Sequence, residues 1–167
     1  MKRSYDHGMT DELAAAVLRD LEARGLTLAT AESLTGGGLG ALLTSVPGSS
    51  AVYVGGVISY ATRVKVDLLE VPLMVVQGDG VVSAACARAM AAGVRRVLGA
   101  DVGVATTGVA GPELQEGKPA GTVFVAVADA RGDAVRALHL SGDRGAIRAA
   151  TAAAGLELLR DRNLAIP

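Results

Sequence analysis

A serine stands between an apolar segment and three consecutive glycines in the stretch "LATAESLTGGGLG". A helix that begins with Gly36, Gly37 and Gly38 would present backbone N–H groups without side chains to cover them, at the positive end of the helix dipole. Such a helix start favours an anion, either a phosphate or a developing oxyanion. Ser33 is placed to attack a carbonyl group whose oxygen points at those N–H groups. The alternative is structural: Ser33 or Thr35 caps the helix, and the glycines allow close packing.

Lysine is rare in this chain, which makes a specific role for it more plausible. Of 16 basic residues, the lysines are Lys2, Lys65 and Lys118. Arginine cannot act as a base near neutral pH, whereas a desolvated lysine can. Lys65 follows Tyr60 in "SYATRVK", so both side chains could enter one pocket. The alternative for Lys65 is an ordinary solvated helix residue.

Spacing and composition argue against a short-chain dehydrogenase and against a site built on histidine. Short-chain dehydrogenases separate their tyrosine and lysine by three residues and carry a G-x-G-x-x-G turn. This chain has neither feature in the segments concerned. A catalytic triad or a histidine metal cage would have to use His7 or His139, of which His139 is the fallback base. The single cysteine, Cys86, excludes an internal disulfide and a cysteine-rich zinc site.

A third polar segment, "ATTGVAGP", places hydroxyl groups at the end of a predicted buried strand. Thr106 and Thr107 precede a loop that contains Gly108 and Gly111. Their hydroxyls could donate to a substrate amide or phosphate, or the segment could be a simple turn that leaves the strand.

Length and composition predict one domain with an aliphatic core. The chain has 167 residues, of which 50% are hydrophobic and 2% aromatic, so Ala, Val and Leu must build the core. Its net charge of -1 is scattered, which argues against nucleic-acid binding. No apolar run approaches the roughly 18 residues of a membrane span, and no signal peptide is evident. We therefore expect a cytoplasmic protein that needs neither a metal nor a cofactor.

Apolar periodicity and turn residues predict helices that alternate with buried strands. This pattern, with one hairpin, indicates an α/β sandwich with a mixed sheet and helices on both faces. The three polar segments described above should converge at the carboxyl ends of strands. After a tail of residues 1–9, with Thr10 as N-cap, the predicted helices cover residues 10–25, 36–46, 62–69, 83–99 and 144–162, and the predicted strands cover 26–31, 51–60, 102–108, 122–128 and 134–140.

Six blocks of sequence, in this order, resemble the C-terminal domain of the CinA (competence/damage-inducible) family, the nicotinamide-nucleotide amidases. The blocks are "TAESLTGG", "VPGSSAVYVGGVISYATRVK", "ARAMAAGVRRVLGAD", "TTGVAGP", "GKPAGTV" and "SGDRGAIR". Each block is weak alone, but six collinear blocks are specific. The resemblance runs from about Leu13 to Leu159, and we assign the domain to residues 10–163.

The resemblance implies a three-layer α/β/α domain that hydrolyses the carboxamide of nicotinamide mononucleotide without a metal. The products would be nicotinic acid mononucleotide and ammonia. At matching positions, Ser33 would be the nucleophile and Lys65 its base, with Tyr60 assisting proton transfer and Thr107 positioning the substrate or the dyad. The family also includes proteins with a pyrophosphatase-like N-terminal domain, and its absence here implies the stand-alone amidase form.

The nucleotide substrate would need N–H donors and positive charge for its phosphate. The expected substrate-binding residues are supplied by glycine turns, one hydroxyl and one arginine: Thr35, Gly36, Gly37, Gly108, Gly111 and Arg144. Arg144 could also be an ordinary surface residue at a helix start. A small domain so rich in apolar residues is further expected to form a homo-oligomer, with a dimer favoured.

One loop departs from the family pattern. After "GVAGP" the family continues with glycines and Thr-Pro, whereas this chain has "ELQE", with carboxylates at Glu113 and Glu116. Two carboxylates beside a nucleotide site would repel a phosphate unless they point away. Two alternatives therefore stay open: a nucleotide-binding module with weak or no turnover, and an amidase for another small amide.

Overall fold

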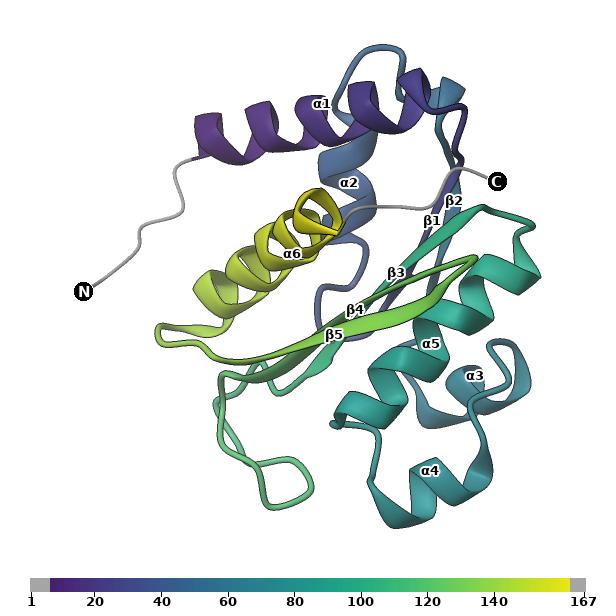
Figure 1. The fold of residues 1–167 in the computed structure, drawn as a ribbon. Coiled ribbons are helices and arrows are strands. Elements are labelled where there is room, and N and C mark those ends of the chain that lie inside the picture. Colours follow the sequence, from purple (N-terminus) through teal and green to yellow (C-terminus); the bar gives the residue numbers. More distant parts are fainter. Residues whose placement is uncertain (1–6, 163–167) are drawn as a thin grey trace.

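A five-stranded mixed sheet forms the centre of the protein (Figure 1). The structure is a computed structural model, and it describes residues 7–162. The strand order is β2-β1-β3-β4-β5. β1 pairs in parallel with β2 and β3, whereas β3, β4 and β5 pair antiparallel. The strands are β1 (Leu28–Glu32), β2 (Tyr53–Ile58), β3 (Val102–Gly108), β4 (Thr122–Asp129) and β5 (Gly132–His139).

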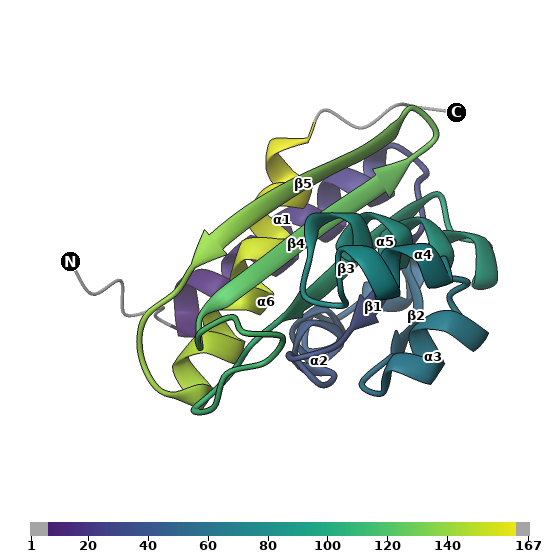
Figure 2. The same cartoon turned by 90° about the horizontal axis from the view of Figure 1, so that it is seen from below.

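Helices cover both faces of this sheet, so the predicted three-layer α/β/α architecture is confirmed (Figures 1 and 2). One layer holds α1 (His7–Ala23), α2 (Gly38–Thr44) and α6 (Arg144–Asp161). The opposite layer holds α3 (Thr62–Asp67), α4 (Leu73–Gly78) and α5 (Ala84–Val97). A short 3-10 helix, η1 (Ser49–Ala51), precedes β2. None of the described helices is long and apolar enough to cross a membrane.

Small side chains let these layers approach closely, which is how a chain with few aromatic residues builds its core. Every residue of β1 and β3 is buried. A Cβ atom at Gly103 of β3 would collide with the Ala91 carbonyl of α5, and one at Gly93 of α5 would collide with the Leu69 carbonyl. Each face of the sheet carries its own apolar cluster. The core therefore depends on close backbone contact more than on large side chains.

The structure corrects several predicted boundaries. α1 begins at His7, so residues 7–9 are helical rather than part of a tail, and Thr10 lies within the helix instead of capping it. The predicted domain end at residue 163 lies outside the described residues, which end at Arg162. α4 was not expected, because its turns carry no apolar stripe: Leu73 and Met74 are mostly exposed. Ser83 caps α5 as predicted, since its side chain accepts the Cys86 N–H.

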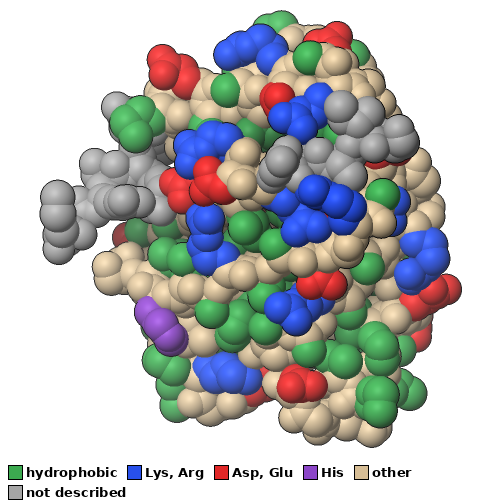
Figure 3. Space-filling view, viewed as in Figure 1, with side chains coloured by type: hydrophobic (Ala, Val, Ile, Leu, Met, Phe, Trp, Pro, Cys, Tyr) green, Lys and Arg blue, Asp and Glu red, His purple; other side chains and the backbone are tan. Residues whose placement is uncertain are grey.

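Asp129, at the end of β4, carries a buried negative charge. At the surface, by contrast, acidic and basic side chains are interspersed, as the face drawn in Figure 3 shows. The Asp129 carboxylate accepts hydrogen bonds from Nε and Nη2 of Arg162, both 2.9 Å long, and from the Arg131 N–H at 2.9 Å. The Arg162 guanidinium holds the pKa of this carboxyl below its usual range despite the opposing effect of burial. The ion pair therefore ties the β4–β5 hairpin to the end of α6.

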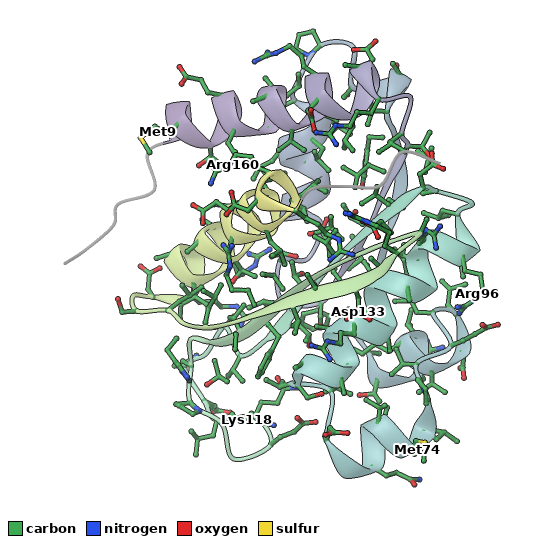
Figure 4. The ribbon with its side chains drawn as sticks, viewed as in Figure 1. Met9, Met74, Arg96, Lys118, Asp133 and Arg160 are labelled. Atoms are coloured by element: carbon green, nitrogen blue, oxygen red, sulfur yellow. The ribbon has the colours of Figure 1, made fainter. Side chains whose placement is uncertain are left out.

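Asp129→Asn is expected to lower the free energy of unfolding at pH 7 by roughly 2 kcal/mol, because it breaks a buried charge-assisted pair. A depressed folded-state pKa contributes stability above the unfolded pKa and loses it as pH falls through the folded pKa. The difference between variant and wild type should therefore shrink in acid. Urea unfolding across this pH range measures it. The exposed Asp133 on the same hairpin (Figure 4) gives the control Asp133→Asn, expected to cost less than about 1 kcal/mol. Equal losses in the two variants would contradict the prediction.

Candidate active site

Ser33 and Lys65 meet at the carboxyl edge of the sheet. The Lys65 side chain is 1% exposed, and its Nζ lies 3.0 Å from the Ser33 Oγ. The same nitrogen donates to the carbonyl oxygens of Ser59, at 2.6 Å, and Tyr60, at 3.3 Å. The three partners are thus one hydroxyl and two carbonyl groups, which can solvate an amine but do not supply a counter-charge. Lys65 is a buried amine in contact with a candidate nucleophile.

Burial changes the acid–base behaviour of Lys65. Desolvation lowers its pKa below the ordinary value for lysine, while Coulombic interactions with Cys86 and Glu116 act in the opposite direction. Burial also raises the pKa of the Cys86 thiol to about 11, so this cysteine stays protonated and unreactive at neutral pH. A lysine with a lowered pKa has a larger neutral fraction near pH 7 and can therefore take a proton from a hydroxyl.

Adjacent parallel strands bring the two residues together. Glu32 and Ile58, at the ends of β1 and β2, are register partners, and the Ser59 N–H donates to the Glu32 carbonyl at 2.8 Å. Ser33 directly follows β1, and its N–H donates to the carbonyl of Thr106 in β3 at 3.0 Å. The chain then turns after β2 into α3, which returns Lys65 beneath Ser33. The predicted convergence of three strand ends is therefore what the structure shows.

Ser33 opens onto a cavity of about 370 Å³. Its walls are Leu34, Tyr60, Arg144 and residues 108–115. The Arg144 guanidinium donates to the Tyr60 hydroxyl at 3.1 Å and to the Gly111 carbonyl at 2.7 Å, so it joins two opposite walls. The Tyr60 hydroxyl thus contacts Arg144, and its carbonyl is the group that contacts Lys65. Of the expected substrate-binding residues, Arg144, Gly108 and Gly111 lie at this cavity.

The glycine-rich helix start differs from the prediction, because the protein fills it with its own carboxylate. Glu32, 2% exposed, accepts the N–H groups of Gly37 at 2.9 Å, Leu39 at 3.0 Å and Gly40 at 2.7 Å. The N–H groups of Gly36 and Gly38 donate to the carbonyls of Ser33 and Thr35. Gly36 and Gly37 are therefore not free to bind an anion, and their role is conformational, with φ of 58° and 98°. The missed signal is Glu32 itself, because a carboxylate at the end of a buried strand needs hydrogen-bond donors nearby.

Two predicted hydroxyl groups are also committed to protein partners. The Thr35 Oγ1 lies 2.8 Å from the Thr106 Oγ1, and both residues are buried. The Thr107 Oγ1 donates to the Val81 carbonyl at 2.6 Å. Thr35 lines a second cavity, of about 260 Å³, between α1, α2 and α6, instead of the one that Ser33 faces. The Thr35 hydroxyl therefore does not face the Ser33 cavity, and the Thr107 hydroxyl contacts the segment before α5 instead of Ser33.

The backbone after Ser33 offers a different place for an oxyanion. Within residues 7–162, the N–H groups of Leu34 and Thr35 have no hydrogen-bond acceptor. The carbonyls of the same two residues accept from the Arg148 guanidinium, both at 2.9 Å, which fixes this turn. An N–H donor on the residue after a nucleophilic serine is a common oxyanion site. Arg148 and Leu34 were missed from the sequence, although Arg148 lies in one of the blocks that resemble the family.

The described part of the chain contains no group of three His, Cys, Asp or Glu side chains arranged to hold a metal ion. His139, the fallback base, is exposed at the end of the edge strand β5. Lys65 is the titratable side chain in contact with the Ser33 hydroxyl.

Comparison with known proteins identifies the family of this chain. The model of the CinA C-terminal domain matches residues 10–163. The chain belongs to the CinA family. It is 48% identical to a CinA-like protein of Frankia casuarinae over 160 residues, which cover 96% of this chain and 37% of that protein. A putative competence-damage inducible protein of Levilactobacillus brevis is 48% identical over 158 residues, 93% of this chain and 38% of that protein. The chain thus spans less than half the length of these curated relatives.

Solved structures of the family share the whole fold. The competence/damage inducible protein CihA from Agrobacterium tumefaciens gives a TM-score of 0.88 at 34% identity and covers 96% of this chain and 98% of its own. A CinA superfamily protein from Klebsiella pneumoniae gives 0.87 at 36% identity and covers 90% and 94%. This CinA-family chain therefore has the family's three-layer domain.

Glu32→Gln tests the filled helix start of this CinA-family domain. An amide cannot accept three N–H groups as a carboxylate does, and we expect a loss of about 2 kcal/mol in the free energy of unfolding. Urea unfolding measures it. Glu22→Gln, at an exposed position of α1, is the matched control and should change stability by less than about 0.5 kcal/mol. A Glu32→Gln protein as stable as the control would show that the carboxylate does not hold α2.

Proposed function

We propose that this domain is a serine amidohydrolase that converts nicotinamide mononucleotide to nicotinic acid mononucleotide and ammonia. The observation that carries the proposal is the contact between the buried Lys65 Nζ and the Ser33 Oγ at the floor of a cavity. The family-like sequence blocks that contain both residues supply the substrate class. An amide needs a strong nucleophile, a proton for the departing amine and a site for negative charge.

In the first half of the reaction, neutral Lys65 takes the Ser33 proton while Oγ attacks the carboxamide carbon. The carbonyl oxygen becomes an oxyanion, which the N–H groups of Leu34 and Thr35 are placed to receive. The C–N bond then breaks as the Lys65 ammonium returns its proton to the nitrogen, which leaves as ammonia. The product at this stage is an ester on Ser33.

In the second half, Lys65 takes a proton from water, and the hydroxyl oxygen attacks the ester carbon. Collapse of the second tetrahedral species breaks the bond to Oγ and returns the proton to Ser33 from Lys65. The carboxylic acid product then leaves and gives up its proton to the solvent, which yields the nicotinic acid carboxylate. Lys65 thus alternates between base and acid, as general acid–base catalysis of a two-step hydrolysis requires.

The cavity wall supports a nucleotide substrate. Arg144 supplies the positive charge for a phosphate, and its hydrogen bonds to Tyr60 and Gly111 fix its direction. In this proposal Tyr60 holds Arg144 and closes the cavity, since its hydroxyl faces the guanidinium. Thr107 acts on the site through Val81.

Two functions compete with this proposal: a nucleotide-binding module without turnover, and an amidase for a different small amide. They are favoured by Glu113, which lines the cavity and adds negative charge where a phosphate would approach. Calorimetric titration with nicotinamide mononucleotide, followed by assay of ammonia, separates the two. Tight binding without conversion over hours supports the module. Faster turnover of unphosphorylated nicotinamide riboside supports the other amide.

Replacement of either member of the pair should abolish turnover of nicotinamide mononucleotide. Ser33→Ala removes the nucleophile, and Lys65→Arg keeps the charge but cannot release a proton near neutral pH. Each should lower kcat by roughly 10³-fold or more. Ammonia release from the purified proteins is the measurement, with Arg63→Lys, an exposed position on the same helix, as control. Equal ammonia release by wild type and Ser33→Ala, or none from wild type, would refute the proposal.

The rate should rise with pH through a pKa below that of an ordinary lysine. Neutral Lys65 is the active form, and burial lowers its pKa, so the acid limb of kcat/KM should lie on the acidic side of a normal lysine titration. A pH profile of initial rates with nicotinamide mononucleotide measures it. An acid limb at the position of a solvent-exposed lysine would contradict the role of buried Lys65.

A further inference from the structure

The loop between β3 and β4 forms one wall of the cavity and is anchored through Glu116. The Glu116 carboxylate accepts the N–H of Val81 at 2.8 Å and that of Val82 at 3.0 Å, one on each oxygen. Lys118 of the same loop (Figure 4) lies 3.5 Å from it. Glu116 also has a φ of 51°, a left-handed conformation that is uncommon for a residue other than glycine. The loop is therefore bent so that this side chain reaches the segment before α5.

Val81 is held from two sides. Its N–H donates to Glu116, and its carbonyl accepts from Thr107 at the end of β3. A Cβ atom at Gly80 would collide with the Glu116 carboxylate, so the close approach depends on glycine there. Three segments thus meet at one peptide: the end of β3, the cavity-lining loop and the start of α5.

We propose that Glu116 is a positioning residue, which latches the cavity-lining segment 113–115 to the start of α5 and fixes the surroundings of Lys65. The proposal rests on the amidase function of Ser33 and Lys65. We call the Glu116 carboxylate and the two N–H groups that it accepts, those of Val81 and Val82, the Glu116 latch. Glu116 is not among the residues that line the cavity, so in this proposal it contributes to substrate binding through the position of the loop.

The charge of the latch also reaches Lys65. The titratable groups that act on Lys65 are Cys86 from α5 and Glu116 from the loop, and both oppose the lowering of its pKa by burial. Because the Cys86 thiol is protonated at neutral pH, Glu116 is the one of the two that carries a charge there. Desolvation alone would raise the pKa of Glu116, but hydrogen bonds from Val82 and Val81 and the charge of Lys118 lower it. The latch is therefore ionised at neutral pH. Removing its charge should move the titration of Lys65 to lower pH.

The first test follows Lys65 itself. Because the lysines are Lys2, Lys65 and Lys118, labelling with [13Cε]lysine gives three NMR signals, and Lys65→Arg assigns the one of interest. In Glu116→Gln the titration midpoint of Lys65 should shift to lower pH. The control is Glu70→Gln, which removes the same charge. Glu70 also has a positive φ, of 55°, and its carboxylate pairs with Arg96 at the surface. An unshifted Lys65 midpoint in Glu116→Gln, or an equal shift in both variants, overturns the proposal.

The second test follows substrate binding. Loss of two charge-assisted hydrogen bonds should raise KM for nicotinamide mononucleotide about tenfold in Glu116→Gln, with a smaller change in kcat. The acid limb of kcat/KM should move to lower pH together with the NMR midpoint. Glu70→Gln should retain wild-type KM. An unchanged KM in Glu116→Gln refutes the latch, whereas absence of wild-type turnover refutes the amidase function and leaves the NMR titration to decide whether Glu116 acts on Lys65.

Discussion

The buried amine of Lys65 is the constraint on which the site depends. An ammonium group without a counter-charge is costly to bury, so the interior favours the neutral form that catalysis requires. The protein compensates with the Ser33 hydroxyl and the carbonyls of Ser59 and Tyr60. Asp129 shows the opposite solution, because its buried charge is matched by Arg162 and stabilises the fold. The chain thus pairs the buried carboxylate of Asp129 with a cation, whereas it gives the buried Lys65 amine only neutral hydrogen-bond partners.

A second buried charge determines where the site can hold an anion. Glu32 occupies the positive end of α2 with three hydrogen bonds, and it does so one residue before Ser33. A carboxylate so placed closes the glycine-rich helix start to any other anion, and it also fixes the turn that presents Ser33. Negative charge that develops on a substrate must therefore be met elsewhere. Leu34, the residue after Ser33, and Arg144 both line the cavity, and they carry the candidate donors for that charge.

Local signals in the sequence predicted the layers, whereas the pairing of Ser33 with Lys65 was expected only from the resemblance to the CinA family. Apolar periodicity identifies the buried faces of α5 and β3, and an isolated lysine after a strand is visible in the composition. α4 was missed because it packs too little apolar surface to produce a periodic pattern. The role of Glu32 was missed for another reason: spacing shows that a carboxylate precedes a helix, but not that its side chain turns back onto the helix N–H groups. The contact of the Thr107 hydroxyl with Val81 was missed for the same reason. Residue order cannot show which way a hydroxyl at the end of a strand points.

The two carboxylates of the unusual loop illustrate this limit further, because neighbouring residues of the same type do opposite things. The Glu116 carboxylate accepts the N–H groups of Val81 and Val82, and Glu116 is not among the residues that line the cavity. Glu113 lines the cavity, so its carboxylate adds negative charge there. Under the proposed function, a substrate phosphate in this cavity would be attracted by Arg144 and repelled by Glu113. The loop then restricts the orientation of the substrate as well as its charge, and its position depends on the hydrogen bonds that Glu116 makes to the start of α5.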